Sequence, residues 1–268
     1  MEQEAEQEEQ ELFKPNAKGF FTLLLESFKF FTLNLPAIAT IVVPVFLIVE
    51  FLVPSLSIFV DDLAEDLTGI GFLDDSLSLV IEYISIEFIR QLIGGIAWIA
   101  VIRVIAGAMH GEKILGVQAL KDGTNMLPMY FVTAVIFYVF LIISSLLLII
   151  PGIIFAVYCA FWQYSYVLRG KGAFSALIYS YSLVKDDFVR VFLNVFGIIV
   201  LLFAFDYFLL ESLSNIIAGA VDSEEGLLYD IVNAILMALG KVLEVGIEII
   251  FLMMLFMTLE EENTETHN

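Results

Sequence analysis

Long apolar runs separated by short polar segments make up most of this chain. The longest uncharged run covers residues 123–168 and is interrupted once, at Pro151-Gly152. A bilayer core is about 30 Å thick and a helix rises about 1.5 Å per residue, so one span needs about 20 apolar residues. This run therefore predicts two transmembrane helices joined at a tight Pro-Gly turn. A buried hairpin in a soluble protein is the alternative, but 268 residues are too few to cover several such segments.

Run length and flanking residues place six transmembrane spans along the chain. They cover approximately residues 36–59, 86–108, 127–150, 152–168, 188–210 and 228–259. The composition agrees, since 60% of the residues are hydrophobic, the mean hydropathy is +0.94 and 16% are charged, against about 25% in an ordinary soluble domain. The predicted fold class is an all-α polytopic membrane protein with about six transmembrane helices.

Amphipathic segments precede spans one, three and five. Before span one, Lys18, Thr22, Glu26 and Lys29 recur every three or four residues, and apolar side chains fill the other faces. The connection between spans four and five shows the same pattern, and residues 112–122 show a weaker version. Such patterns are typical of helices that lie in the membrane interface. We therefore expect an interfacial helix ahead of each odd-numbered span.

Basic residues are retained on the cytoplasmic side of membrane proteins, so their positions orient the spans. With both termini cytoplasmic, ten of the twelve Lys and Arg residues fall on the cytoplasmic side, and only Arg90 and Lys241 do not. The reverse orientation would place those ten outside. We predict a multi-pass protein of the inner (cytoplasmic) cell membrane with both termini in the cytoplasm.

Acidic residues concentrate in the tails and in the two predicted outer loops, and they give the chain a formal net charge of −20. A surface of this sign does not suit nucleic acid, which requires a basic patch. The acidic loops are interpreted as a solvated face, with an outer cation-binding face as the alternative. We predict an acidic disordered tail over residues 1–14, a six-span membrane domain over residues 15–259, and an acidic C-terminal tail over residues 260–268 that is also expected to be disordered.

Ionisable residues inside spans are the first place to seek function. The last span carries Lys241, Glu244 and Glu248, at spacings that put all three on one helical face. Unpaired charges at this depth are costly, so we expect an internal ion pair or a wet cavity. Three interpretations stay open: a structural Lys–Glu pair, a pathway for ions or protons, and a site for a lipid head group or small solute.

Motifs of enzyme chemistry do not occur in the sequence. The single cysteine, Cys159, lies in an apolar run, and the two histidines, His110 and His267, are too few for a histidine-based metal site. The chain has no HExxH motif, no cysteine cluster and no phosphate-binding glycine loop that opens a helix. We therefore expect no enzyme activity, no metal and no cofactor.

A distinctive pattern covers residues 149–191. Pro151-Gly152-Ile153 begins a short span, a glycine-rich turn follows at Gly170-Lys171-Gly172, and a helix comes next. In this pattern the chain resembles a family of prokaryotic membrane proteins that includes the YciC-like inner-membrane proteins and the membrane domain fused to some glycerophosphodiester phosphodiesterases. The resemblance implies a six-span integral membrane protein and transfers no catalytic residue. The positions that carry it are Pro151, Gly152, Gly170, Gly172, Ala176, Ser180, Leu183 and Lys185.

Three classes of function are compatible with these features. The preferred hypothesis is a non-enzymatic scaffold or accessory protein in envelope or lipid homeostasis, because interfacial helices and the lack of catalytic motifs favour it. The alternative is a small transporter or channel that uses the Lys241/Glu244/Glu248 face, which would then line a cavity together with a polar residue from another span. The third is an intramembrane lipid enzyme. Membrane lipids are the expected partners, whereas a protein partner or a homo-oligomer stays open.

Overall fold

The computed structural model describes residues 19–68, 93–221 and 227–266 of the chain. These residues form helices joined by short turns, and they include no strand. Five of the helices are long and apolar enough to cross a bilayer. The protein is therefore an all-α polytopic membrane protein, as the sequence predicted.

The five long apolar helices coincide with five of the six predicted spans. They cover Phe20–Val49, Gly116–Ser145, Ile149–Arg169, Phe188–Ile217 and Ile231–Thr264. The predicted second span begins outside the described residues, and its described part forms the shorter apolar helix Ile93–Met109. That helix crosses the next one closely, because a Cβ atom on Gly123 would lie 2.9 Å from the Ile96 carbonyl oxygen.

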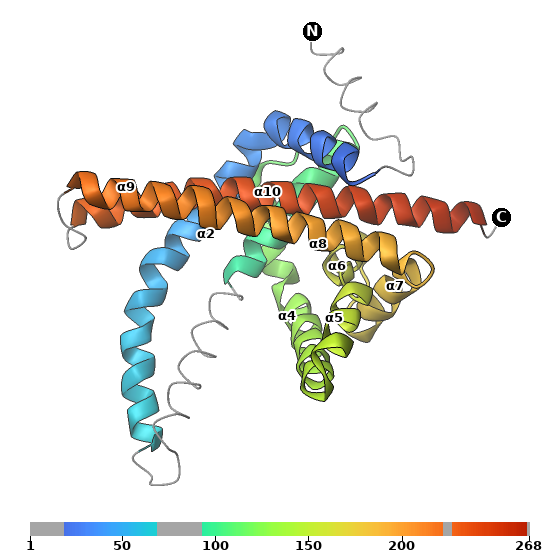
Figure 1. The fold of residues 1–268 in the computed structure, drawn as a ribbon, viewed down its shortest axis with the longest axis horizontal. Coiled ribbons are helices and arrows are strands. Elements are labelled where there is room, and N and C mark those ends of the chain that lie inside the picture. Colours follow the sequence, from blue (N-terminus) through green and yellow to red (C-terminus); the bar gives the residue numbers. More distant parts are fainter. Residues whose placement is uncertain (1–18, 69–92, 222–226, 267–268) are drawn as a thin grey trace.

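The first helix, α2, is longer than the sequence predicted. It covers Phe20–Thr68, so the expected interfacial helix and the first span form one continuous element. Figure 1 shows that its blue beginning lies over α10 and that its cyan half turns away from it. The helix contains Pro36, Pro44 and Pro54, and proline inside a helix removes a hydrogen bond and bends the axis.

The turn between the third and fourth spans lies three residues before the predicted place. Helix α4 covers Gly116–Leu147 and helix α5 covers Ile149–Tyr158, so Pro151-Gly152 belongs to the first turn of α5. Extended Leu148, with φ −169° and ψ 150°, makes the connection instead. The first turn of a helix tolerates proline because its missing N–H has no partner there. The two helices approach each other closely here, since a Cβ atom on Gly152 would come within 3.1 Å of the Ser145 Cα atom.

The fourth span is broken in the middle. Helix α5 ends at Tyr158, residues 159–161 form a turn, and helix α6 covers Trp162–Arg169. Helix α7, Phe174–Val184, then fills the connection to the fifth span, where the sequence predicted an interfacial helix. Ahead of α4 no separate helix is present among the described residues, since the helix begins at Gly116 and continues directly into the span.

The last two spans lie side by side, and α10 is the central helix of the fold. Helix α8 (Phe188–Phe205), a single π-helical segment η1 (Asp206–Leu210) and helix α9 (Glu211–Val221) run along α10 (Leu227–Thr266), as Figure 1 shows. Helix α2 crosses the other side of α10 at Gly246, where a Cβ atom would come within 2.5 Å of the Phe31 ring. Consequently every residue of α10 from Ile247 to Phe256 is buried, with the exception of Glu248.

Candidate functional site

The three charged residues of α10 separate into an ion pair and a single carboxylate. Lys241 forms an ion pair with Glu244, one helical turn away, and the two side chains are one third and one fifth exposed. Glu248 lies one turn further along. Its carboxylate makes no hydrogen bond or ion pair with any of the residues that the structure describes. The structure thus contains the predicted Lys–Glu pair, and it leaves Glu248 outside that pair.

Glu248 faces a cavity of about 500 Å³ between the helices. The walls come from helix Ile93–Met109 and from α4, α5, α6, α8 and α10. Gln163 of α6 also lines this cavity, so Glu248 shares it with a polar residue from another span. The transporter hypothesis required the whole charged face to line a cavity, but Lys241 and Glu244 are not among the lining residues. Among the described lining residues, Glu248 is the only one that carries a charge.

Aromatic side chains make up much of the cavity wall. Six of them line it: Trp98, Phe137, Tyr138, Trp162, Phe192 and Phe196. The rings also support one another, because Phe137 stacks on Trp162 with centroids 5.8 Å apart and Phe192 stacks on Phe196 at 5.7 Å. The first pair joins α4 to α6, whereas the second lies along α8. Offset or stacked ring pairs of this kind add to the packing of the wall.

Some polar atoms of the cavity wall have hydrogen-bond partners and others do not. The Gln163 amide donates a hydrogen bond to the Tyr130 hydroxyl at 2.9 Å, so its orientation is fixed. The indole N–H of Trp98 is buried and has no hydrogen-bond partner among the described residues. Buried polar groups are normally paired, so an unpaired donor and an unpaired carboxylate among the residues of one wall are unusual for a purely structural interior.

One side of the cavity opens to the outer surface of the helix bundle. Ile153 of α5 and Phe196 and Ile199 of α8 line the cavity, and each is about half exposed. In a membrane protein an exposed apolar surface of this kind contacts lipid. The cavity is therefore accessible from an apolar face of the protein, where α5 and α8 both contribute exposed lining residues.

The residues that carry the family resemblance shape this part of the fold. Ser180 of α7 accepts a hydrogen bond from the Phe161 N–H at 3.0 Å and donates one to the Tyr158 carbonyl at 2.8 Å. These two bonds replace helical bonds that are lost where α5 breaks into α6. Ser175 and Ser182, by contrast, donate to carbonyl groups three residues earlier in the chain. Ser180 instead fixes the turn that precedes the cavity residues Trp162 and Gln163.

The other motif positions form the turn and the packing of α7. Gly170 ends α6 with φ +63°, a left-handed conformation that glycine adopts at no cost, and Gly172 lies against Met129. Ala176 and Leu183 are buried in the core. Lys185 pairs with neighbouring Asp186 at 3.7 Å. The motif is thus a structural unit that extends from the first turn of α5 to the end of α7, and none of its residues lines the cavity.

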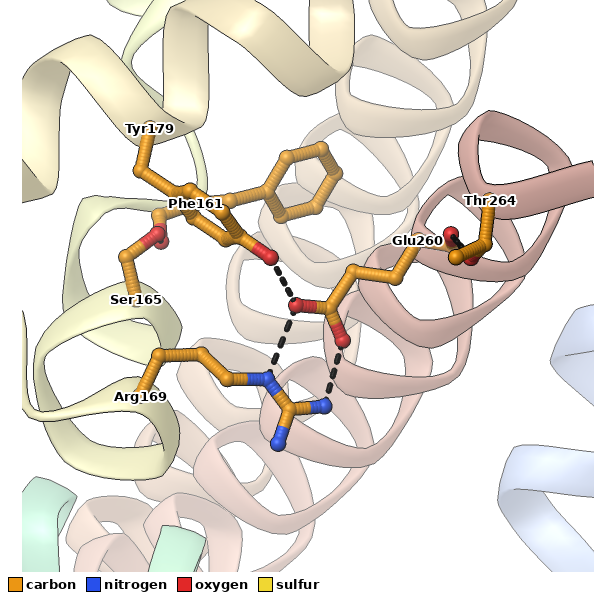
Figure 2. A network of polar contacts seen from close by, with 6 residues as sticks. All are labelled: Phe161, Ser165, Arg169, Tyr179, Glu260 and Thr264. Atoms are coloured by element: carbon orange, nitrogen blue, oxygen red, sulfur yellow. Dashed lines mark hydrogen bonds and ion pairs between the residues drawn. The ribbon is translucent and has the colours of Figure 1, made fainter. Parts of the chain in front are cut away.

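A second polar network joins α10 to the connection between spans four and five (Figure 2). Glu260 of α10 accepts two hydrogen bonds from the Arg169 guanidinium, at 2.9 and 2.6 Å, and a third from the Tyr179 hydroxyl. Burial, followed by the bond to Glu260, raises the pKa of Tyr179 to about 12. Arg190 pairs with Glu262 at 2.7 Å in the same region.

This network corrects the expectation of a disordered C-terminal tail. Residues 260–266 continue α10, and the Glu260 side chain is only 13% exposed. The prediction failed because the acidic composition was read as a solvated tail. A usable signal was present, since Arg169 and Arg190 flank the predicted cytoplasmic connection that faces the same side.

The fold defines an all-α polytopic membrane protein, and its described part contains a largely apolar cavity with half-exposed lining residues on one side. Within the described residues, no group of three or more His, Cys, Asp or Glu side chains is placed to hold a metal ion. No family model, curated protein or solved structure matches this chain.

Proposed function

We propose that this chain is a non-enzymatic integral membrane protein that binds an apolar or amphipathic molecule from the bilayer, in an accessory role in lipid or envelope homeostasis. The observation that carries this proposal is the cavity of about 500 Å³ that opens between α5 and α8. Ligand pockets in proteins measure about 300–1,000 Å³ and are mostly apolar with a few polar groups. The resemblance to the YciC-like family is compatible with this role and remains a proposal.

The retention of Glu248 supports a binding role for the cavity. A carboxyl group inside a membrane protein costs stability, and such groups occur mainly where function requires them. Hydrophobic side chains fill the rest of this part of α10, so an apolar residue at position 248 would pack with its neighbours more cheaply.

Native mass spectrometry of the detergent-purified protein tests the proposal. The wild type should carry a bound lipid or other amphiphile, and Ala156→Phe should lose it because Ala156 lines the cavity. Ile142→Phe is the matched control, since Ile142 is exposed on α4 and lies away from the cavity lining. A wild type that carries no bound molecule, or an Ala156→Phe variant that retains it fully, would refute the proposal.

A small transporter is the second candidate, and one observation favours it. Glu248 lines the cavity together with Gln163 of another span, which is the arrangement that a transport pathway requires. The Lys241–Glu244 pair argues for a structural role of the other two charges. Flux measured in liposomes separates the candidates, because transport through the cavity should be lost in both Glu248→Gln and Ala156→Phe.

We propose an inner-membrane location with both termini in the cytoplasm. The Lys and Arg asymmetry supports this orientation. The Arg169–Glu260 and Arg190–Glu262 pairs also support it, because they join the end of α10 to the basic residues that flank the connection between spans four and five. A reporter fused after Asn268 should be cytoplasmic, and one inserted near Gly71, outside the described residues, should be external. External activity of the C-terminal fusion would overturn this orientation.

A further inference from the structure

We infer that the ligand of the cavity is a lipophilic organic cation, such as an amine or quaternary ammonium group attached to an apolar body. This inference rests on the proposed binding function and names the chemical class that the cavity selects. Two independent features support it: the charge of the lining and its aromatic character.

The lining contains one acidic group and no positively charged residue among its described members. Glu248 is the only charged residue among the described lining residues. Lys241 is the nearest cation on the same helical face, and it pairs with Glu244 instead. A carboxylate without a partner in a poorly solvated place favours a ligand that carries a positive charge. The reason is that burying an ion pair costs less free energy than burying either ion alone.

The aromatic wall suits the same class of ligand. Six aromatic residues surround the space that Glu248 faces. The faces of aromatic rings carry partial negative charge and attract cations, and cages of such rings recognise quaternary ammonium groups. The rings also pack against a hydrocarbon body. A ligand with both parts would therefore use the whole lining.

Other ligand classes fit the lining less well. An anionic head group would face Glu248 with no lining cation to balance it. A hard metal cation such as Ca²⁺ or Mg²⁺ requires about six oxygen ligands, and the described lining offers one carboxylate and one amide oxygen besides hydroxyl and backbone groups. A small hydrophilic cation would have to leave water and cross lipid to reach an opening lined by Ile153, Phe196 and Ile199.

The two tryptophans of the chain give a direct measurement. Trp98 and Trp162 are the only tryptophans in the sequence, and both line the cavity. A bromine atom held nearby quenches their fluorescence. The probes are (4-bromobenzyl)trimethylammonium, its neutral carbon isostere 4-bromoneopentylbenzene, and the anion (4-bromophenyl)methanesulfonate. The first two share their shape and differ in charge.

In the purified protein, the cation and the neutral isostere should each quench the tryptophan fluorescence saturably, and the cation should bind with at least tenfold higher affinity. The anion should cause no saturable quenching. Glu248→Gln should lower the affinity for the cation at least tenfold and leave the affinity for the neutral isostere unchanged. Glu211→Gln is the control, because it removes one carboxylate from an exposed position on α9. Ala156→Phe should lower the affinity for both the cation and the neutral isostere. If Glu248→Gln does not fold, the affinities of the wild type for the cation and for its neutral isostere still test the inference.

The outcomes separate this inference from the proposed function. Equal affinity for the cation and its isostere in the wild type, or a Glu248→Gln variant that keeps the cation preference, would overturn the inference and leave the binding function standing. If none of the probes quenches the fluorescence saturably, both the inference and the proposed binding function are refuted.

Discussion

The hydroxyl group of Ser180 accepts a hydrogen bond from the backbone N–H of Phe161, at 3.0 Å, in the turn that divides the fourth span. The same hydroxyl donates to the Tyr158 carbonyl, so one side chain satisfies a donor and an acceptor that the broken helix leaves unpaired. Unpaired backbone groups are especially costly in a membrane, because no water can replace the partner. Helix α7 therefore holds the break in place, and with it the cavity residues that follow.

Ser180→Ala should lower the free energy of unfolding by about 1–3 kcal/mol, because it leaves two buried backbone groups without partners. Ser182→Ala is the matched control on the same helix. Ser182 is exposed and bonds only to the Tyr179 carbonyl one turn before it, so its removal should change stability by less than about 0.5 kcal/mol. Thermal unfolding in detergent compares the two variants, and equal melting temperatures for both would contradict the role given to Ser180.

Gly152→Ala should destabilise the α4–α5 pair by about 1–3 kcal/mol through overpacking. Its new methyl group would lie 2.3 Å from the Ser145 hydroxyl oxygen and 3.1 Å from the Ser145 Cα atom, and the backbone atom cannot move aside without shifting a helix. Adding Ser145→Ala should recover part of the loss. Gly94→Ala is the control, since nothing lies within 4 Å of that position. Thermal unfolding of the four proteins is the measurement, and a Gly152→Ala variant as stable as the control would refute the close contact.

Hydrophobic run length predicted the fold class and the places of five long helices, because the bilayer thickness alone sets that signal. It misplaced the turn before α5. Pro151-Gly152 is typical of a turn, but proline is equally suited to the first turn of a helix. Nothing in the sequence around Leu148 indicates that this residue is extended and ends α4. Local sequence signals of this kind do not distinguish the two positions.

The candidate site was predicted in part. Helical spacing placed Lys241, Glu244 and Glu248 on one face, and the pairing of the first two follows from that spacing. The separation of Glu248 does not follow, because it depends on side chains of five other helices that surround it. Residues of the cavity wall are distributed from Trp98 to Leu252, and only tertiary packing brings them together.

Arg169 and Glu260 should show an interaction energy of about 1 kcal/mol in a double-mutant cycle. Their two-bond geometry and the burial of Glu260 favour a measurable value, whereas the 44% exposure of the Arg169 side chain limits it. The cycle uses Arg169→Met, Glu260→Gln and the double variant, with unfolding monitored by circular dichroism. Deletion of residues 260–268 should also lower stability. A truncated protein as stable as the wild type would show that the end of α10 is an unattached tail.

Alkaline pH should weaken the contact between α7 and α10. The pKa of Tyr179 rises from about 10 to about 12 in the folded protein, so the folded state binds this proton more tightly than the unfolded state does. The resulting stability is complete below pH 10 and is lost as the pH rises through about 12. Tyr179→Phe has no such proton. The difference in melting temperature between wild type and Tyr179→Phe should therefore shrink between pH 10 and pH 12, and a constant difference would contradict the assignment.

The Lys241–Glu244 pair should behave as a structural contact that is independent of the cavity. Lys241→Met alone leaves the Glu244 carboxylate without its partner, and this should cost about 1 kcal/mol, since both side chains keep partial access to the surroundings. Lys241→Met combined with Glu244→Gln removes both charges and should restore most of the loss. Ligand quenching of the two tryptophans should stay unchanged in the double variant, because neither residue lines the cavity. A double variant that regains stability but loses ligand binding or liposome flux would instead assign the whole face to function, as the transporter hypothesis requires.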